Sequence, residues 1–143
     1  DRRDLYNCAL VCRAWHHRSQ ALLYFRVFLA DAEAYDSLAR FAIQSPRSSR
    51  YLSSTRMLEI HSAYTASICP CSPLVLGRSM PHLQCLSLRN CLHPPYHDSF
   101  VTFMSQFTAV QHLWLDNFEL KSFADFRRII CSLPRLRDLH LAG

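Results

Sequence analysis

The sequence predicts an α/β solenoid in which short parallel strands line one face and helices cover the other. The main observation is a motif of three spaced apolar residues, found at 83–88, 110–115 and 136–141 with a looser match at 55–60. The middle apolar residues are Leu58, Leu86, Leu113 and Leu139, so the steps between matches are 28, 27 and 26 residues. Four matches at nearly one period indicate structural units that stack on one another.

The motif has the form of a leucine-rich repeat. Residues 83–91 spell L-x-x-L-x-L-x-x-C, which is the strand and turn of that repeat. The steps lie within its usual range of roughly 20–29 residues. Leu86 and Leu88 alternate with polar or small residues, as expected for a strand with one buried face. Cys91 occupies the repeat's asparagine or cysteine position, so we expect it to support the turn.

Helix signals separate the expected strands, and residues 26–29 resemble a first strand. The signals are capping residues followed by apolar side chains at helical spacing. The polar, serine-rich residues 47–54 are expected to be a mobile linker. The helices expected on this basis cover residues 32–44 after Asp31, the segment from Ser72-Pro73 to Met80, the segment from Asp98 through Phe107, and the segment from Ser122 through Leu133.

The first residues predict an amphipathic helix over 4–15, with apolar side chains at helical spacing up to Trp15. His16-His17-Arg18-Ser19 interrupts this pattern, and a second short helical stretch begins at Gln20. Cys8 and Cys12 are expected to be buried free thiols on this helix.

Residues 4–15, D-L-Y-N-C-A-L-V-C-R-A-W, and the Ala21-Leu22-Leu23-Tyr24 that follows resemble the second half of an F-box. The pattern of that motif is D-L-x-x-C-x-x-V-C-R-x-W with a leucine-rich helix behind it, and its first half is missing here. The resemblance implies a division into residues 1–25, the C-terminal half of an F-box, and residues 26–143, a leucine-rich repeat region. That region would have about four to five rungs and be open at its C-terminus.

An F-box followed by leucine-rich repeats resembles the substrate-receptor subunit of a Skp–cullin–F-box (SCF) ubiquitin ligase. In that family the F-box binds a Skp-type adaptor protein and the repeats hold a target protein. The resemblance assigns adaptor binding to Leu5, Cys8, Leu10, Val11, Cys12, Trp15 and Leu22. For Cys12 and Trp15, a place in the F-box's own core is an equal alternative.

Strand alternation predicts which residues would meet a target protein. If the motif leucines point into the core, the residues between them point to the concave face, in columns about 4.8 Å apart from rung to rung. Trp114 is the most notable of these, because tryptophan with polar neighbours is typical of an interface. The candidate target-binding residues are Glu59, Ser87, Arg89, His112, Trp114, Asp116, Asp138 and His140.

Composition excludes several classes of function. The net charge is +5, but the arginines are scattered and Lys121 is the only lysine, so we expect no nucleic-acid groove. No apolar run approaches the roughly 18 residues of a membrane span, so we expect no membrane association. The seven cysteines show no disulfide framework. Reduced cysteines favour an intracellular protein of the cytoplasm, the nucleus or both.

Metal binding and catalysis have little support in the sequence. Cys69, Cys71, Cys91, His93 and His97 are the best metal-ligand candidates, but a single His-x₃-His pair falls short of the two pairs that structural zinc prefers. No glycine-rich phosphate loop and no hydrolase motif is present. We therefore expect no cofactor, no metal and no enzymatic activity. The sequence favours a non-enzymatic substrate-recognition subunit, and the alternative is a repeat scaffold that binds a partner protein without a ligase.

Overall fold

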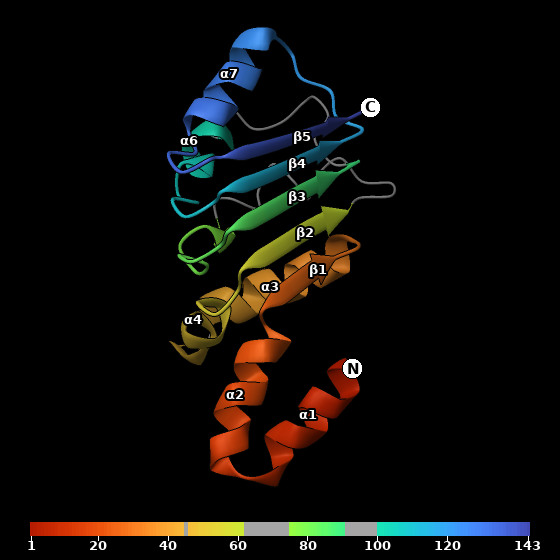
Figure 1. The fold of residues 1–143 in the computed structure, drawn as a ribbon, viewed down its shortest axis with the longest axis vertical. Coiled ribbons are helices and arrows are strands. Elements are labelled where there is room, and N and C mark those ends of the chain that lie inside the picture. Colours follow the sequence, from red (N-terminus) through yellow and green to blue (C-terminus); the bar gives the residue numbers. More distant parts are fainter. Residues whose placement is uncertain (45, 62–74, 91–99) are drawn as a thin grey trace.

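The fold is mixed α/β and contains a five-stranded parallel sheet (Figure 1). The computed structural model describes residues 1–44, 46–61, 75–90 and 100–143. The strands, β1 to β5, lie side by side in chain order. This confirms the predicted strands and their parallel, sequential arrangement. The bounds are Arg26–Leu29 for β1, Met57–His61 for β2, Cys85–Arg89 for β3, His112–Asp116 for β4 and Asp138–Ala142 for β5.

The register of the sheet aligns the motif leucines. Leu58 pairs with Leu86, Leu86 with Leu113, and Leu113 with Leu139, while Val27 of β1 pairs with Leu58. A slip of one residue would turn every leucine to the opposite face, so burial of this row fixes the register.

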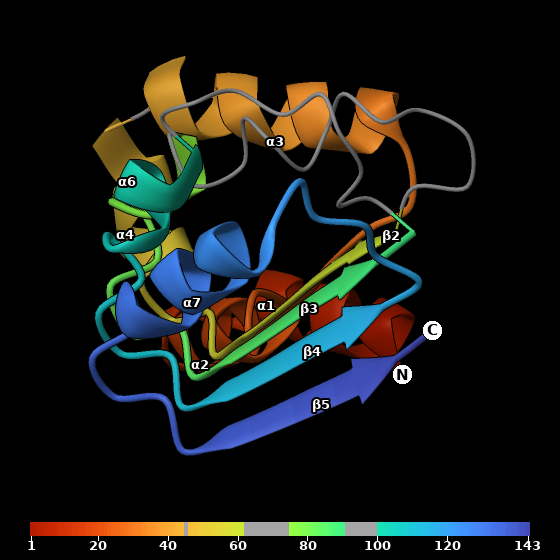
Figure 2. The same ribbon diagram turned by 90° about the horizontal axis from the view of Figure 1, so that it is seen from above.

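Helices cover one face of the sheet. Figure 2 shows α3 (Ala32–Gln44), α6 (Phe100–Met104) and α7 (Phe123–Cys131) on the same side of the strands, and none of the described helices covers the other side. Two expected caps are confirmed, because Asp31 Oδ1 accepts from the Ala34 N–H at 2.8 Å and Ser122 Oγ accepts from the Asp125 N–H at 3.2 Å. Each cap satisfies one of the N–H groups that the first turn leaves without a helical partner.

The hydrophobic core lies between the sheet and these helices. The motif leucines of β2, β3 and β4 are at most 2% exposed, and the phenylalanines of the loops and helices fill the space behind them. On β5 the alternation is lost, since Leu139 is 37% exposed and Leu141 is 52% exposed. The largest fully buried side chains are Phe100, Phe107, Leu52, Leu58, Ile60, Leu76, Met80, Leu83, Leu86, Met104 and Leu113.

The N-terminal segment forms a helical hairpin, and the prediction of one helix over residues 4–15 is wrong. α1 (Arg2–Val11) and α2 (Arg13–Leu23) are separated by Cys12, whose backbone is extended. His16 lies in the first turns of α2, and its Nδ1 lies 3.0 Å from the Ala9 carbonyl oxygen of α1. Apolar residues recur at helical spacing on both sides of Cys12, so the sequence pattern gave no sign of the break.

Residues 46–52 also differ from the prediction, because Pro46–Leu52 form a helix, α4. Leu52 and Ser48 are fully buried, and Ser48 Oγ donates to the Ala42 carbonyl at 3.2 Å. Tertiary contacts thus stabilise a helix that its polar composition did not indicate. α6 is shorter than expected and ends before Phe107, whose N–H closes a turn on the Met104 carbonyl. The expected helix starts at Ser72 and Asp98 lie outside the described residues.

Candidate protein-binding surfaces

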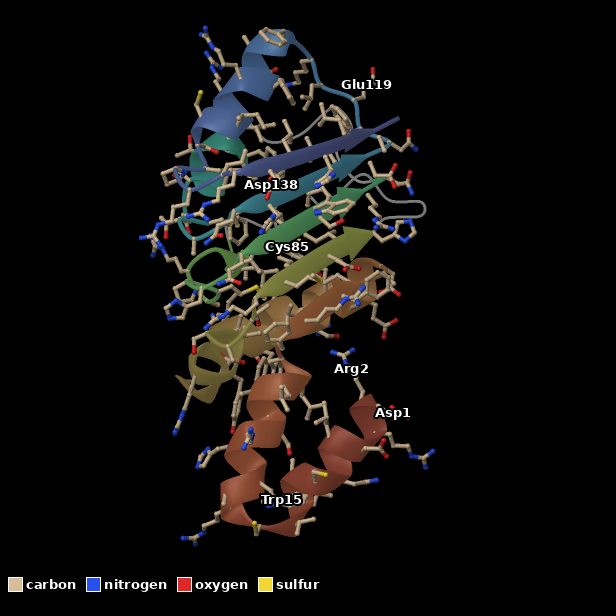
Figure 3. The ribbon with its side chains drawn as sticks, viewed as in Figure 1. Asp1, Arg2, Trp15, Cys85, Glu119 and Asp138 are labelled. Atoms are coloured by element: carbon tan, nitrogen blue, oxygen red, sulfur yellow. The ribbon has the colours of Figure 1, made fainter. Side chains whose placement is uncertain are left out.

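The face of the sheet that lies opposite the described helices is here called the sheet face. It carries the predicted target-binding columns. Glu59, Ser87, Trp114 and His140 stand in one row across β2 to β5, as the alternation predicts. Figure 3 shows Cys85 and Asp138, from the neighbouring row, on the same sheet. The register also places His112 beside Asp138 and Arg89 beside Asp116.

Ser87 differs from the expectation of an accessible contact residue. It is only 4% exposed, and its hydroxyl has no hydrogen-bond partner among the described residues. Its short side chain lies in the row between Glu59 and Trp114, both of which extend further from the sheet. Ser87 therefore lies at the base of the central row, below the level that a binding partner would contact first. The longer side chains beside it reach further toward solvent.

The most exposed part of the central row is an aromatic pair. The Trp114 and His140 rings are nearly parallel, with an interplanar angle of 17° and centroids 4.0 Å apart. Trp114 remains 41% exposed, so the ring has a free face. Exposed tryptophan with a fixed orientation provides large contact area at low entropic cost on binding.

An Arg–carboxylate ion pair and a histidine–carboxylate contact fix other side chains of this face. Arg26 Nη2 lies 2.8 Å from a Glu59 carboxylate oxygen, and His112 Nδ1 lies 2.8 Å from Asp138 Oδ2. Pairs with at least one solvent-exposed partner contribute about 1 kcal/mol or less to folding. Their effect here is to orient polar groups toward solvent rather than to hold the sheet together.

A shallow hollow of about 270 Å³ adjoins the aromatic pair. Among the described residues, no ion pair joins Arg89 to Asp116, although the two sit opposite each other in register. The hollow thus offers a free cation and a free carboxylate beside an aromatic wall, a combination suited to a polypeptide partner. Its lining residues are Arg89, Trp114, Leu115, Asp116, His140, Leu141 and Ala142.

An asparagine ladder closes the carboxyl end of the sheet face, and the sequence analysis missed it. The Asn90 side-chain amide donates to His61 Nε2 at 3.0 Å, and Asn117 Nδ2 donates to Asn90 Oδ1 at 2.6 Å. Both asparagines have positive φ, 52° at Asn90 and 47° at Asn117. Asparagine tolerates this left-handed conformation better than most residues. The recurrence of asparagine directly after two repeat strands was the available signal.

The helical hairpin of α1 and α2 forms a second surface, here called the hairpin surface. Leu10 is 69% exposed, Val11 68%, Trp15 55% and Leu22 51%. Cys12 is also exposed, whereas Leu5 and Cys8 are partly buried. The expectation of buried thiols is therefore wrong for Cys12, and a core position for Cys12 or Trp15 is not observed.

A hollow of about 450 Å³ opens on the hairpin surface. Trp15 stands at the end of the hairpin farthest from the sheet (Figure 3). Contiguous exposed apolar side chains beside a hydrophobic hollow make this surface a candidate for protein contact. The hollow is lined by Cys8, Ala14, Trp15, Arg18, Ser19 and Leu22.

Polar and aromatic contacts join the hairpin to the sheet. Arg2 Nη2 donates to the carbonyls of Leu23 and Arg26 at 3.3 Å, and so connects α1 to the start of β1. The Tyr24 ring stacks between Phe41 and Tyr51, at centroid distances of 6.0 and 5.6 Å. Burial raises the pKa of the Tyr24 hydroxyl, which stays neutral. These contacts set the direction of the hairpin relative to the sheet.

The remaining site predictions concern metal and catalysis. In the described part of the chain no three His, Cys, Asp or Glu side chains are grouped to hold a metal ion. The candidate ligands Cys69, Cys71, Cys91, His93 and His97 lie outside that part. The expectation of no metal, no cofactor and no enzymatic activity stays a prediction.

None of the described helices combines the length and the apolar character that crossing a bilayer requires. No protein-family model matches this chain, and no curated protein or solved structure matches it either.

Proposed function

We propose that the protein is a non-enzymatic substrate-recognition subunit of an SCF-type ubiquitin ligase, built as a leucine-rich repeat solenoid behind the C-terminal half of an F-box. The observation that carries this proposal is the separation of two surfaces. The hairpin surface exposes apolar residues at F-box positions, and the sheet face, joined to it through Arg2, exposes an aromatic pair among fixed charges.

The hairpin surface would bind a Skp-type adaptor. Leu10, Val11, Trp15 and Leu22 lie within the segment that resembles the F-box and have exposed side chains. Covering four such side chains favours association because each buried apolar Å² contributes about 25 cal/mol before the costs of binding. Leu5 and Cys8 lie partly under this surface and would support it from within.

The sheet face would bind the target protein. Trp114 and His140 form its centre, and Glu59, Arg89, Asp116, His112 and Asp138 surround them, with Ser87 at the base. The nearly regular spacing of the strands supports the solenoid, because five parallel strands in chain order follow from a repeating strand–helix unit.

Such a subunit acts by tethering. One surface attaches the protein to the ligase, the other holds the target, and the local concentration of target lysines near the catalytic subunits rises. Lys121 is the only lysine of the chain, so the receptor itself offers few acceptor sites. A ligase subunit of this type works in the cytoplasm or the nucleus.

The test is direct binding of the 143-residue chain to a purified Skp-type adaptor, measured by calorimetry. Val11→Asp and Trp15→Ala are expected to weaken binding at least about tenfold, as for central interface residues. Both side chains are exposed, so the variants should keep the melting temperature of the parent. Trp114→Ala, on the sheet face, is the matched control and should bind normally.

Lack of binding by the parent chain, or equal binding by all variants, would reject the adaptor assignment. The alternative, a repeat scaffold without a ligase, would then account for the sheet face alone.

A further inference from the structure

The connections that lead into the strands differ in charge from the rest of the molecule. We define the basic rim as residues 52–56, 76–84, 104–111 and 131–137, which precede β2, β3, β4 and β5. These segments contain no Asp or Glu. Asp31, Asp116 and Glu119 lie toward the other end of the strands, whereas Asp138, the first residue of β5, directly follows the rim. The rim carries four arginines and one histidine, which are Arg56, Arg78, His82, Arg135 and Arg137.

Backbone hydrogen bonds hold the rim in a row. The Gln84 N–H donates to the Arg56 carbonyl at 2.9 Å, and the Gln111 N–H donates to the Gln84 carbonyl at 2.8 Å. The Arg137 N–H in turn donates to the Gln111 carbonyl at 2.8 Å. The residues before successive strands therefore stand one strand spacing apart, about 4.8 Å. All lie at the edge opposite the arrowheads in Figure 1.

A hollow of about 410 Å³ lies at the β5 end of this row, lined by Gln111, Pro134, Arg135, Leu136 and Arg137. Both arginines are exposed, and neither side chain has a hydrogen-bond or ion-pair partner among the described residues. The neighbouring carboxylate, Asp138, is engaged by His112 at 2.8 Å. The two guanidinium groups are thus available to a ligand.

At the other end of the row Arg56 is fixed by the backbone. Its Nη1 lies 3.4 Å from the Ser53 carbonyl oxygen and 3.3 Å from that of His82. These contacts hold its charge at the rim without neutralising it, since carbonyl groups carry no net charge. His82 and Arg78 are exposed beside it.

We propose that the basic rim binds an acidic segment of a partner protein. Guanidinium groups bind carboxylates through paired hydrogen bonds, and a row with no acidic residue attracts an anionic chain along its length. No Phe, Tyr or Trp is exposed on the rim, because its one such residue, Phe107, is 1% exposed. Nucleic-acid surfaces offer aromatic rings for bases to stack on, so this composition favours an acidic polypeptide.

This surface is separate from the hairpin surface and the sheet face, and its assignment does not depend on the ligase proposal. The test measures fluorescence anisotropy of a labelled poly-glutamate peptide with the 143-residue chain, beside a poly-serine peptide and a single-stranded oligonucleotide of equal length. The Arg135→Gln/Arg137→Gln double variant removes the free guanidinium groups of the rim. Arg3→Gln/Arg13→Gln removes the same charge from exposed positions of the hairpin and is the matched control.

The expected result is binding of poly-glutamate that weakens with added salt, with a loss of roughly tenfold in the rim variant and little change in the control variant. Two equal losses would mean attraction to the net charge alone and would overturn the proposal. Absence of peptide binding, or tighter binding of the oligonucleotide, would overturn it as well. Unchanged melting of both variants shows that the comparison concerns binding and not folding.

Discussion

The Trp114 ring stacks on the His140 ring of the adjacent strand, with 4.0 Å between the centroids. The two residues are 26 positions apart, one repeat step, and directly paired in the sheet. Because neither ring is buried in the core, their contact belongs to the surface of the molecule. It gives the sheet face a preformed aromatic centre.

The first prediction measures this stack. A double-mutant cycle with Trp114→Ala and His140→Ala should give a coupling energy of about 0.5–1.5 kcal/mol in urea unfolding, as for other aromatic pairs. The control is Phe123→Ala with His140→Ala, since Phe123 is 78% exposed on α7. Additive effects of the Trp114 and His140 substitutions would contradict the stacked geometry.

The second prediction compares neighbouring residues of β3. Leu86→Ala should reduce the free energy of unfolding by about 2–5 kcal/mol, because it opens a cavity in the core. Ser87→Ala should be neutral or slightly stabilising, because it removes a buried hydroxyl that has no hydrogen bond within the described structure. A loss above about 1 kcal/mol for Ser87→Ala would mean that this hydroxyl has a partner.

The third prediction concerns the asparagine ladder. Asn90→Ala should destabilise the protein by roughly 2–3 kcal/mol, since it strains a residue with positive φ and removes side-chain hydrogen bonds to His61 and Asn117. Asn90→Gly removes the same bonds but permits positive φ, so it should cost about 1 kcal/mol less. Equal stability of the two variants would exclude a contribution from backbone conformation.

The fourth prediction concerns thiol reactivity. Burial, then the charge of Glu59, raises the pKa of the Cys85 thiol, while Arg26 lowers it. Since the thiolate is the reactive form, Cys85 should be alkylated by iodoacetamide more slowly than the exposed Cys12 and Cys131 at mildly alkaline pH. Peptide mass spectrometry after timed quenching resolves the individual sites.

A substitution tests the cause of that pKa. Glu59→Gln removes a nearby negative charge, lowers the pKa of Cys85 and should accelerate its alkylation, whereas the rate at Cys12 should not change. An unchanged rate at Cys85 would leave burial as the whole explanation.

The sequence alone determined the strands, their order and their register. Leucines at 58, 86, 113 and 139 recur with a nearly constant step, and only one alignment of parallel strands places all of their rows on the same face. The helix caps at Asp31 and Ser122 could also be predicted from the sequence, because each joins a side chain to a backbone N–H only three residues away. The membership of the sheet-face columns followed from the same alternation.

Only the tertiary structure decided the break at Cys12, the helix over Pro46–Leu52, the burial of Ser87 and the stacking of Trp114 on His140. The burial of Ser87 and the Trp114–His140 stack depend on residues from neighbouring strands that lie about one repeat apart in the sequence. The break at Cys12 and the helix over Pro46–Leu52 are accompanied by side-chain contacts to backbone six or seven residues away, which apolar periodicity does not reveal. The hairpin's exposed apolar residues belong to the same class. Their apolar composition is typical of buried residues. They remain exposed because two packed helices have too little surface between them to bury every apolar side chain.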